Sequence, residues 1–180
     1  MELKLHERPD AGTWERALAL YHQSFAAEGR KPDAVLSRML ERELCVLAVM
    51  EDAEELAAMA ICGVLDEPKL LLIDYIAVRA DLRGRGIGAD FVGRIAAWAQ
   101  RLKLRGLLIE AEADETPDNE ARMRFWEKCG FERTSYVHQY IWVPEPYSAM
   151  IRDFDPDASR PADGRALFRQ ISNYHRRSFR

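Results

Sequence analysis

The spacing of apolar residues predicts strands and helices in alternation along the whole chain. A short alternating segment, residues 3–5, predicts the first strand. Apolar residues then recur at helical spacing from about residue 10 to residue 27, and either Asp10 or Thr13 caps the start of that helix. Pro32 opens a second helix, whose apolar face consists of Val35, Leu36, Met39 and Leu40.

Two apolar runs in the middle of the chain, residues 44–50 and 56–65, predict the strands of a hairpin, because only a short acidic stretch separates them. Residues 56–59 taken alone are also compatible with a helix. Residues 70–78 are almost continuously Leu, Ile and Val around Asp74, a pattern typical of a strand that is buried on both faces.

The second half of the chain continues this alternation. After a glycine-rich segment we predict a helix over residues 87–104, a strand over 106–111, a helix over 117–130, strands over 131–143 and 147–154, and a helix over 163–179. This order predicts an α/β protein, a mixed α+β sandwich with helices flanking a central sheet. We expect one domain over residues 1–154 and a helical extension over residues 155–180 that packs on the same domain.

The composition excludes several classes of protein. Of the 180 residues, 48% are apolar and 31% are charged, which is the balance of a globular rather than a disordered chain. The net charge of −4 disfavours nucleic acid as the main partner, although residues 175–180 are locally basic. The longest apolar run, residues 57–65, is far shorter than the ~20 residues of a spanning helix, and the N-terminal residues do not resemble a secretory signal.

Cysteine and histidine are sparse. The three cysteines are odd in number and widely spaced, and the four histidines show no metal-ligand spacing. This usage predicts neither a disulfide framework nor a zinc site and is typical of a reducing compartment. We therefore expect a cytoplasmic protein without a membrane segment and without a metal.

The glycine-rich segment Arg83-Gly84-Arg85-Gly86-Ile87-Gly88 lies between the buried strand and the next helix. Glycine lets the backbone approach a ligand closely, and the N–H groups at the start of a helix bind phosphate oxygens. A pyrophosphate is therefore the expected ligand. The alternative is a tight turn that needs glycine but binds nothing.

Two other phosphate-binding patterns fit this segment less well. Gly84, Gly86 and Ala89 also satisfy the dinucleotide pattern Gly-x-Gly-x-x-Ala, and Glu110 follows at about the expected distance. Residues 79–83, however, separate the glycines from the strand, and only one more helix–strand repeat follows. A kinase-type P-loop is excluded because the sequence Gly-Lys-Ser/Thr is absent from the segment.

Two motifs together give the chain a family resemblance. Ile76-Ala77-Val78, followed by the segment of residues 83–88, resembles the acyl-CoA signature of the GNAT superfamily of N-acetyltransferases, Arg/Gln-x-x-Gly-x-Gly/Ala. Asn119-Glu120-Ala121, with Phe125-Trp126-Glu127-Lys128-Cys129-Gly130-Phe131 after it, resembles the second hallmark, Asn-x-x-Ala leading to Phe-Tyr-Glu-Lys-x-Gly-Phe. The separation of the motifs and the order of the elements are also similar, over about residues 3–154.

The resemblance implies a fold in which two neighbouring strands splay apart and leave a slot for the pantetheine of acetyl-CoA. Main-chain groups of residues 76–78 would bind the pantetheine amides like an added strand. The loop of residues 83–88 would hold the pyrophosphate, with its two arginines adding positive charge. Asn119 would reach the pantetheine arm, unless it only caps its helix, and the ring of Trp126 would pack against the pantetheine.

Direct acetyl transfer needs a neutral amine, a polarised thioester and a proton for the departing thiolate. Asp74 is the candidate for deprotonating or holding the amine, because a lone carboxylate in a buried strand is costly unless it is paired or used. A structural role, as partner of an arginine or a backbone N–H, has equal weight. Glu110 and Glu112 share one face of the next strand and could assist, although a solvated pair at the edge of the sheet is the favoured interpretation.

The proton donor is not evident from the sequence, because Trp126 stands where the family usually has a tyrosine and an indole N–H has no accessible acid chemistry. The remaining aromatic side chains belong to the core by default, and some could line an acceptor pocket: Tyr21, Phe25, Tyr75, Tyr136, Tyr140 and Trp142.

These observations predict an acetyl-CoA-dependent N-acetyltransferase that moves an acetyl group by direct transfer to a primary amine of a small molecule or amino-containing metabolite. The alternatives are a protein or peptide acetyltransferase and a catalytically silent acyl-CoA-binding module, for which Trp126 is the best support. The expected partners are acetyl-CoA and an amine acceptor, with a homodimer also allowed; we expect neither a membrane nor a nucleic acid. The acceptor itself is left open, because variable segments around residues 24–40 and 136–147 would form its pocket.

Overall fold

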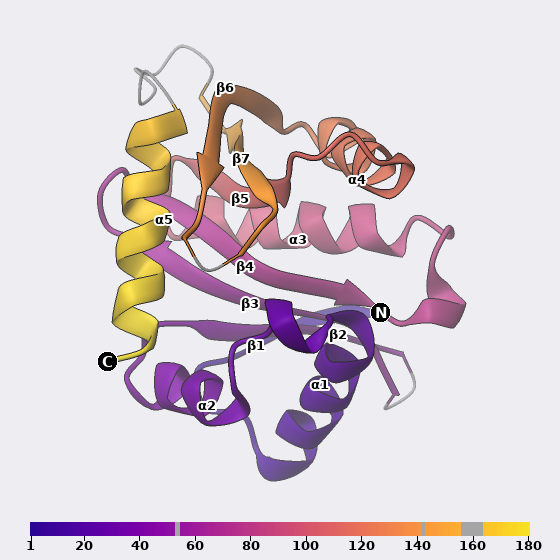
Figure 1. Ribbon diagram of the computed structural model, residues 1–180. Helices are drawn as coiled ribbons and strands as arrows, with labels where there is room; N and C mark the ends of the chain where they lie inside the picture. Colours follow the sequence, from indigo (N-terminus) through magenta and orange to yellow (C-terminus); the bar gives the residue numbers. More distant parts are fainter. Residues whose placement is uncertain (53–54, 142, 156–163) are drawn as a thin grey trace. The chain divides into compact units, whose positions relative to one another are not determined.

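The structure is a computed structural model that describes residues 1–52, 55–141, 143–155 and 164–180 (Figure 1). Its elements are β1 (Glu2–His6), α1 (Ala11–Ser24), α2 (Asp33–Glu41), β2 (Val46–Asp52), β3 (Glu55–Leu65), β4 (Leu70–Val78), α3 (Ile87–Arg101), β5 (Gly106–Glu112), α4 (Pro117–Lys128), β6 (Glu132–Gln139), β7 (Pro146–Asp153) and α5 (Gly164–Ser178). The predicted order of strands and helices is confirmed, and so is the mixed α/β fold class.

The strands form one sheet in the order β1-β2-β3-β4-β5-β7-β6. The β4–β5 pair is parallel, whereas the β1–β2, β2–β3, β5–β7 and β6–β7 pairs are antiparallel. The predicted hairpin of β2 and β3 is confirmed, and the helical alternative for residues 56–59 is wrong, because these residues pair with β2, for example Met59 with Val49. Pairing of backbone groups along the ladder outweighs the weak helical preference of a four-residue segment.

The chain divides into two compact units. The first comprises Met1–Val64, Ile73–Ile95 and Arg177–Arg180, and the second comprises Leu65–Leu72 and Ala96–Arg176. Strand β4 and helix α3 each contribute residues to both units. The division into a domain over residues 1–154 and a packed extension over residues 155–180 stays a prediction.

In the first unit, helix α1 begins at the predicted cap. The Asp10 carboxylate accepts a hydrogen bond from the backbone N–H of Thr13 over 2.9 Å. The helix ends at Ser24, earlier than predicted, because Phe25 adopts an extended conformation and packs edge-on against the ring of Tyr75, with 5.1 Å between the ring centroids. The whole predicted apolar face of α2 is buried.

In the second unit, the predicted C-terminal helix is confirmed as α5, which buries Leu167, Ile171 and Tyr174. Strand β6 ends at Gln139, before the predicted residue 143. There it is paired with Pro146, whose ring nitrogen carries no hydrogen to continue the ladder. The Gln139 side-chain amide instead donates to the carbonyls of residues 143 to 145 and closes the hairpin loop. The predicted aromatic residue Trp142 lies outside the described residues.

None of the helices among the described residues is both long enough and apolar enough to cross a bilayer.

Candidate active site

The loop between β4 and α3 has the conformation that its glycines predict. Gly84 and Gly86 have φ angles of +75° and +79°, which favour glycine over any residue with a Cβ. A Cβ added at either position would meet no atom of the protein within 4 Å, so the space beside both glycines is open. The glycines are thus required by the backbone path rather than by crowding, and the loop leaves room for a ligand against its main chain.

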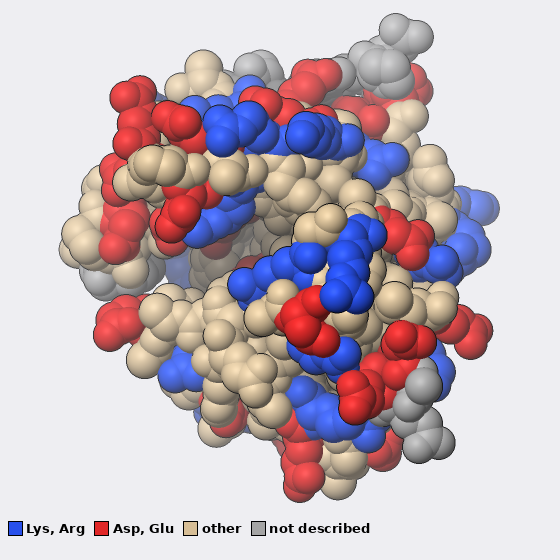
Figure 2. Space-filling view, turned by 90° about the vertical axis from the view of Figure 1, so that its right-hand side faces the viewer, with Lys and Arg blue, Asp and Glu red and all other residues tan. Residues whose placement is uncertain are grey.

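The charge and direction of this loop suit an anion. Helix α3 begins at Ile87, and its first N–H groups have no carbonyl of a preceding helical turn to bind. Arg83 donates from Nε to the carbonyl of Val78 over 3.0 Å, which fixes its guanidinium near the end of β4. Arg85 is exposed. Figure 2 shows that Lys and Arg side chains are interspersed with Asp and Glu on the face of the molecule seen there.

The end of β4, where Ile76, Ala77 and Val78 lie, extends past the ladder that β4 forms with β5. The parallel ladder with β5 pairs Leu70–Leu72 with Gly106–Leu108, and residues 76–78 lie beyond these three pairs. Ala77 is buried, whereas Ile76 and Val78 are half-buried.

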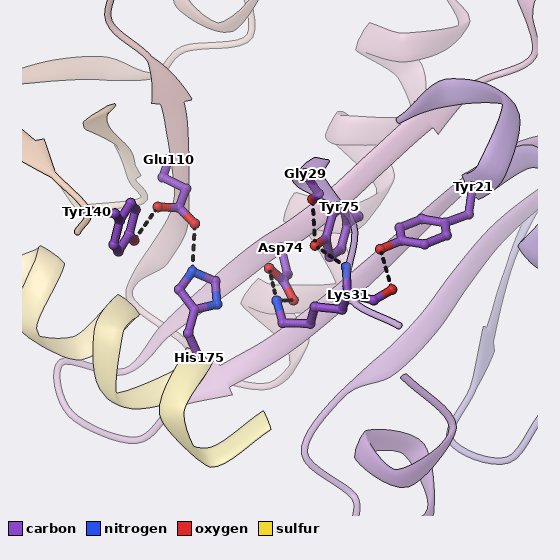
Figure 3. Close-up of polar contacts among 8 residues, drawn as sticks. All are labelled: Tyr21, Gly29, Lys31, Asp74, Tyr75, Glu110, Tyr140 and His175. Atoms are coloured by element: carbon purple, nitrogen blue, oxygen red, sulfur yellow. Dashed lines mark hydrogen bonds and ion pairs between the residues drawn. The ribbon is translucent and has the colours of Figure 1, made fainter. Parts of the chain in front are cut away.

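Asp74 is engaged in a buried ion pair within the first unit (Figure 3). The Nζ atom of Lys31 lies 2.8 Å from one carboxylate oxygen of Asp74 and 2.7 Å from the other. The exposed fractions of the two side chains are 6% and 2%. The sequence allowed either a catalytic or a structural role for Asp74. The structure contains the interaction expected for the structural role, an ion pair, with a lysine rather than an arginine as the partner.

Two tyrosines hold the segment that carries Lys31. The Tyr75 hydroxyl donates to the carbonyl of Gly29 and accepts from the N–H of Lys31, each over 3.1 Å (Figure 3). Tyr21 donates to the carbonyl of Lys31 over 3.2 Å. Burial raises the pKa of Tyr21 to about 12 and raises that of Tyr75 further, so both phenols stay protonated at neutral pH and act as hydrogen-bond donors.

In the second unit, Glu110 on β5 contacts Tyr140, which follows β6, and His175 on α5. Its carboxylate accepts a hydrogen bond from the Tyr140 hydroxyl over 2.7 Å and lies 2.6 Å from Nε2 of His175 on α5 (Figure 3). The Glu110 side chain is 17% exposed. The interpretation of Glu110 as a solvated edge residue is therefore wrong, whereas Glu112 is more exposed and makes only a long pair with Arg122.

Asn119 and Trp126, the predicted ligand contacts on α4, are both buried. The cap of α4 is Thr116, whose hydroxyl accepts from the N–H of Asn119, so the reading of Asn119 as the cap is wrong. The Asn119 amide donates to the carbonyl of Asp114 and lines a cavity of about 200 Å³. Trp126 packs edge-on against the rings of Phe125 and Phe131, at centroid distances of 5.1 and 5.0 Å.

The acidic lining of this cavity, which includes Glu112, Asp114, Glu115, Glu120 and Glu127, does not suit a phosphate. An uncharged part of a ligand fits it better than a pyrophosphate does.

The cysteines offer no activated nucleophile. All three are free thiols, and Cys45 and Cys62 are buried. Burial raises the pKa of Cys45 to about 12 and also raises that of Cys62 and Cys129. A cysteine needs its thiolate form to attack a thioester, so none of the three is poised to form an acyl-enzyme at neutral pH.

Sequence reasoning missed Lys31 and His175, the residues that bind the two candidate carboxylates. A lysine just before Pro32 and a histidine on a basic C-terminal helix resemble ordinary surface residues. The one available signal was Asp74 itself, since a buried carboxylate predicts a partner without saying which residue provides it.

A family model described as the acetyltransferase (GNAT) family matches residues 13–131. Among solved structures, a GNAT-family acetyltransferase of Bacteroides thetaiotaomicron is similar at a TM-score of 0.79 and 14% identity, covering 96% of this chain and 97% of its own. An aminoglycoside 6'-N-acetyltransferase complexed with coenzyme A is similar at a TM-score of 0.73 and 13% identity. The match covers 88% of this chain and 100% of the aminoglycoside acetyltransferase.

The ribosomal-protein-S18-alanine N-acetyltransferase of Escherichia coli gives a TM-score of 0.66 and 14% identity, covering 88% and 99% of the two chains. At these identities the structural likenesses establish the fold alone. No curated protein sequence matches this chain.

Proposed function

The chain belongs to the acetyltransferase (GNAT) family, and on that premise we propose that it transfers the acetyl group of acetyl-CoA to a primary amine of a small molecule or amino-containing metabolite. The observation that carries the proposal is the open backbone at Gly84 and Gly86, directly before the positive end of α3. This is the geometry that a pyrophosphate requires from a main chain.

Acetyl-CoA is assigned to residues from both motifs. The loop of residues 83–88 would bind the pyrophosphate, and the main chain of residues 76–78 would bind the pantetheine amides. Asn119 would contact the pantetheine arm, in keeping with the acidic surroundings that disfavour a phosphate there. The Trp126 ring, which packs against Phe125 and Phe131, would support the same arm.

The reaction proposed is direct transfer. The amine nitrogen forms a bond to the acetyl carbon, the carbon–sulfur bond breaks, and CoA leaves as a thiolate that then takes up a proton. The raised pKa values of the cysteines support this route over one through a cysteine acyl-enzyme. Asp74 would accept the proton that the amine loses, the role for which the sequence marks a carboxylate in a buried strand.

Acetyl-CoA is expected to raise the melting temperature of the protein, whereas NADH is expected to leave it unchanged. A ligand that binds only the native state stabilises it by about 2.7 kcal/mol at a hundredfold excess over Kd. Differential scanning fluorimetry with each ligand measures the shift. A shift with NADH alone, or equal shifts with both, would point to a dinucleotide site instead.

Asp74→Asn is expected to lower turnover by about 10²–10⁴-fold, the usual contribution of general acid–base catalysis, and most strongly below the pKa of the acceptor amine. Trp126→Phe is the comparison variant and should keep most of the turnover, since it preserves a packed ring. The pH profile of kcat/KM, measured by CoA release, reports the loss of a base. Circular dichroism of both variants measures any loss of folded protein, which Asp74→Asn can cause because it leaves Lys31 buried without its carboxylate. An unaffected Asp74→Asn enzyme beside an inactive Trp126→Phe enzyme would mean that the roles are reversed.

The acceptor can be found by following CoA release against amines, amino acids and aminoglycosides. Release with any of them separates an enzyme from a silent acyl-CoA-binding module. Acetylation of a peptide N-terminus in the same assay, with no small amine active, would favour the peptide acetyltransferase.

A further inference from the structure

The second unit contains a cavity of about 330 Å³ between helix α5 and strand β6. Helix α5 contributes Arg165, Arg169 and Arg176 to its lining, and β6 contributes Tyr136 and His138. A volume of this order matches sites for small organic molecules. Neither of the sequence motifs includes these residues.

The charges in this cavity are unbalanced. The three arginines are four and seven residues apart, so they lie on one face of α5. Among the described residues that line the cavity there is no aspartate or glutamate. Among the described residues, none of the three arginines makes an ion pair, and the Arg165 guanidinium lies over an aromatic ring. The three arginines are exposed, and an excess of like charge on one concave surface attracts an anion.

Rings cover the side of the cavity that faces β6. The Arg165 guanidinium lies 5.1 Å from the centroid of the Tyr136 ring. His138 stacks on Phe168, with 4.5 Å between centroids and 15° between planes. Burial lowers the pKa of His138, outweighing the opposite effect of the Glu110 carboxylate, so its imidazole is a neutral ring at neutral pH. Among the described residues that line the cavity, the positive charge therefore comes from the arginines alone.

We propose that this cavity binds the carboxylate or phosphate group of a small aromatic anion. Arginine presents several N–H groups in a plane and binds two oxygens of such a group at once. The side chains of Ser172 and Asn173, which also line the cavity, offer neutral hydrogen bonds to the same oxygens. The rings of Tyr136 and His138 would contact the planar part of the ligand. The proposal does not depend on acetyl transfer.

Isothermal titration of the full-length protein with benzoate, phenyl phosphate and phenol tests the proposal. We expect at least one of the two anions to bind and phenol not to bind, and comparison of benzoate with phenyl phosphate identifies the preferred group. Arg169→Gln and Arg176→Gln should each weaken binding by about tenfold or more, since each removes a charge-assisted hydrogen bond. Ser172→Asp should abolish binding by placing a carboxylate in the cavity.

Arg177→Gln is the matched control, because it makes the same change on the same helix at a residue that does not line the cavity. It should leave the affinity unchanged. The acetyl-CoA melting shift should persist in Arg169→Gln, which separates this cavity from the CoA site. Absence of binding by both anions, an equal loss in Arg177→Gln, or loss of the acetyl-CoA shift in Arg169→Gln would overturn the proposal.

Discussion

Replacing Lys31 by methionine is expected to destabilise the protein by about 3–5 kcal/mol, the usual cost of removing one partner of a buried ion pair. Methionine keeps much of the volume of the lysine stem but removes the ammonium that contacts both oxygens of Asp74. The carboxylate is almost fully buried, so water cannot replace this contact without opening the fold. For a chain of this length the loss corresponds to a fall of roughly 6–20 °C in Tm.

The Lys4→Met variant provides the matched control, because Lys4 forms its ion pair with Glu51 at the surface, where half of the lysine side chain is exposed. Its Tm should stay close to that of the parent. The double variant Lys31→Met/Asp74→Asn should be more stable than Lys31→Met alone, since it removes the buried negative charge as well. Thermal and urea unfolding of the parent, Lys31→Met, Asp74→Asn and the double variant measures the coupling. Equal destabilisation by Lys4→Met and Lys31→Met would contradict a buried pair.

The second large effect is expected at Gly86, where valine should abolish detectable CoA binding while the protein stays folded. A β-branched residue strongly disfavours the φ of +79° found there, so the loop would have to take another path. Its methyl groups would also occupy the open space in which the pyrophosphate is expected. Because the loop is exposed, the cost falls on ligand binding more than on the core.

Gly93→Val is the comparison for this experiment. Gly93 lies further along α3, also has no atom within 4 Å of an added Cβ, and has no positive φ. Isothermal titration with CoA should show unchanged affinity for this variant, and circular dichroism should show that both proteins are folded. Wild-type affinity in a folded Gly86→Val protein would remove the loop from the CoA site.

The order of elements could be predicted from the sequence because it depends on local patterns. The spacing of apolar residues shows whether a segment forms a helix or a strand. Residues such as Asp10 and Pro32 mark where helices begin. The requirement for glycine at Gly84 and Gly86 is also local, because it follows from the backbone conformation of the loop. The predicted ends of helices and strands were less accurate where tertiary contacts decide the end. Examples are the end of α1, where Phe25 packs on Tyr75, and the end of β6, where Gln139 pairs with Pro146.

Side-chain partners that are distant in sequence could not be predicted in the same way. The sequence by itself determined the fold class, the glycine loop and the burial of Asp74, since each follows from a run of neighbouring residues. Only the tertiary structure decided that Lys31, 43 residues away, neutralises Asp74, and that His175, 65 residues away, contacts Glu110. It likewise decided that three arginines of α5 and two rings of β6 line one cavity. The physical reason is that a charged side chain pairs with whichever group the folded backbone brings within hydrogen-bond distance. The local spacing of residues in the sequence does not predict which distant residue that will be.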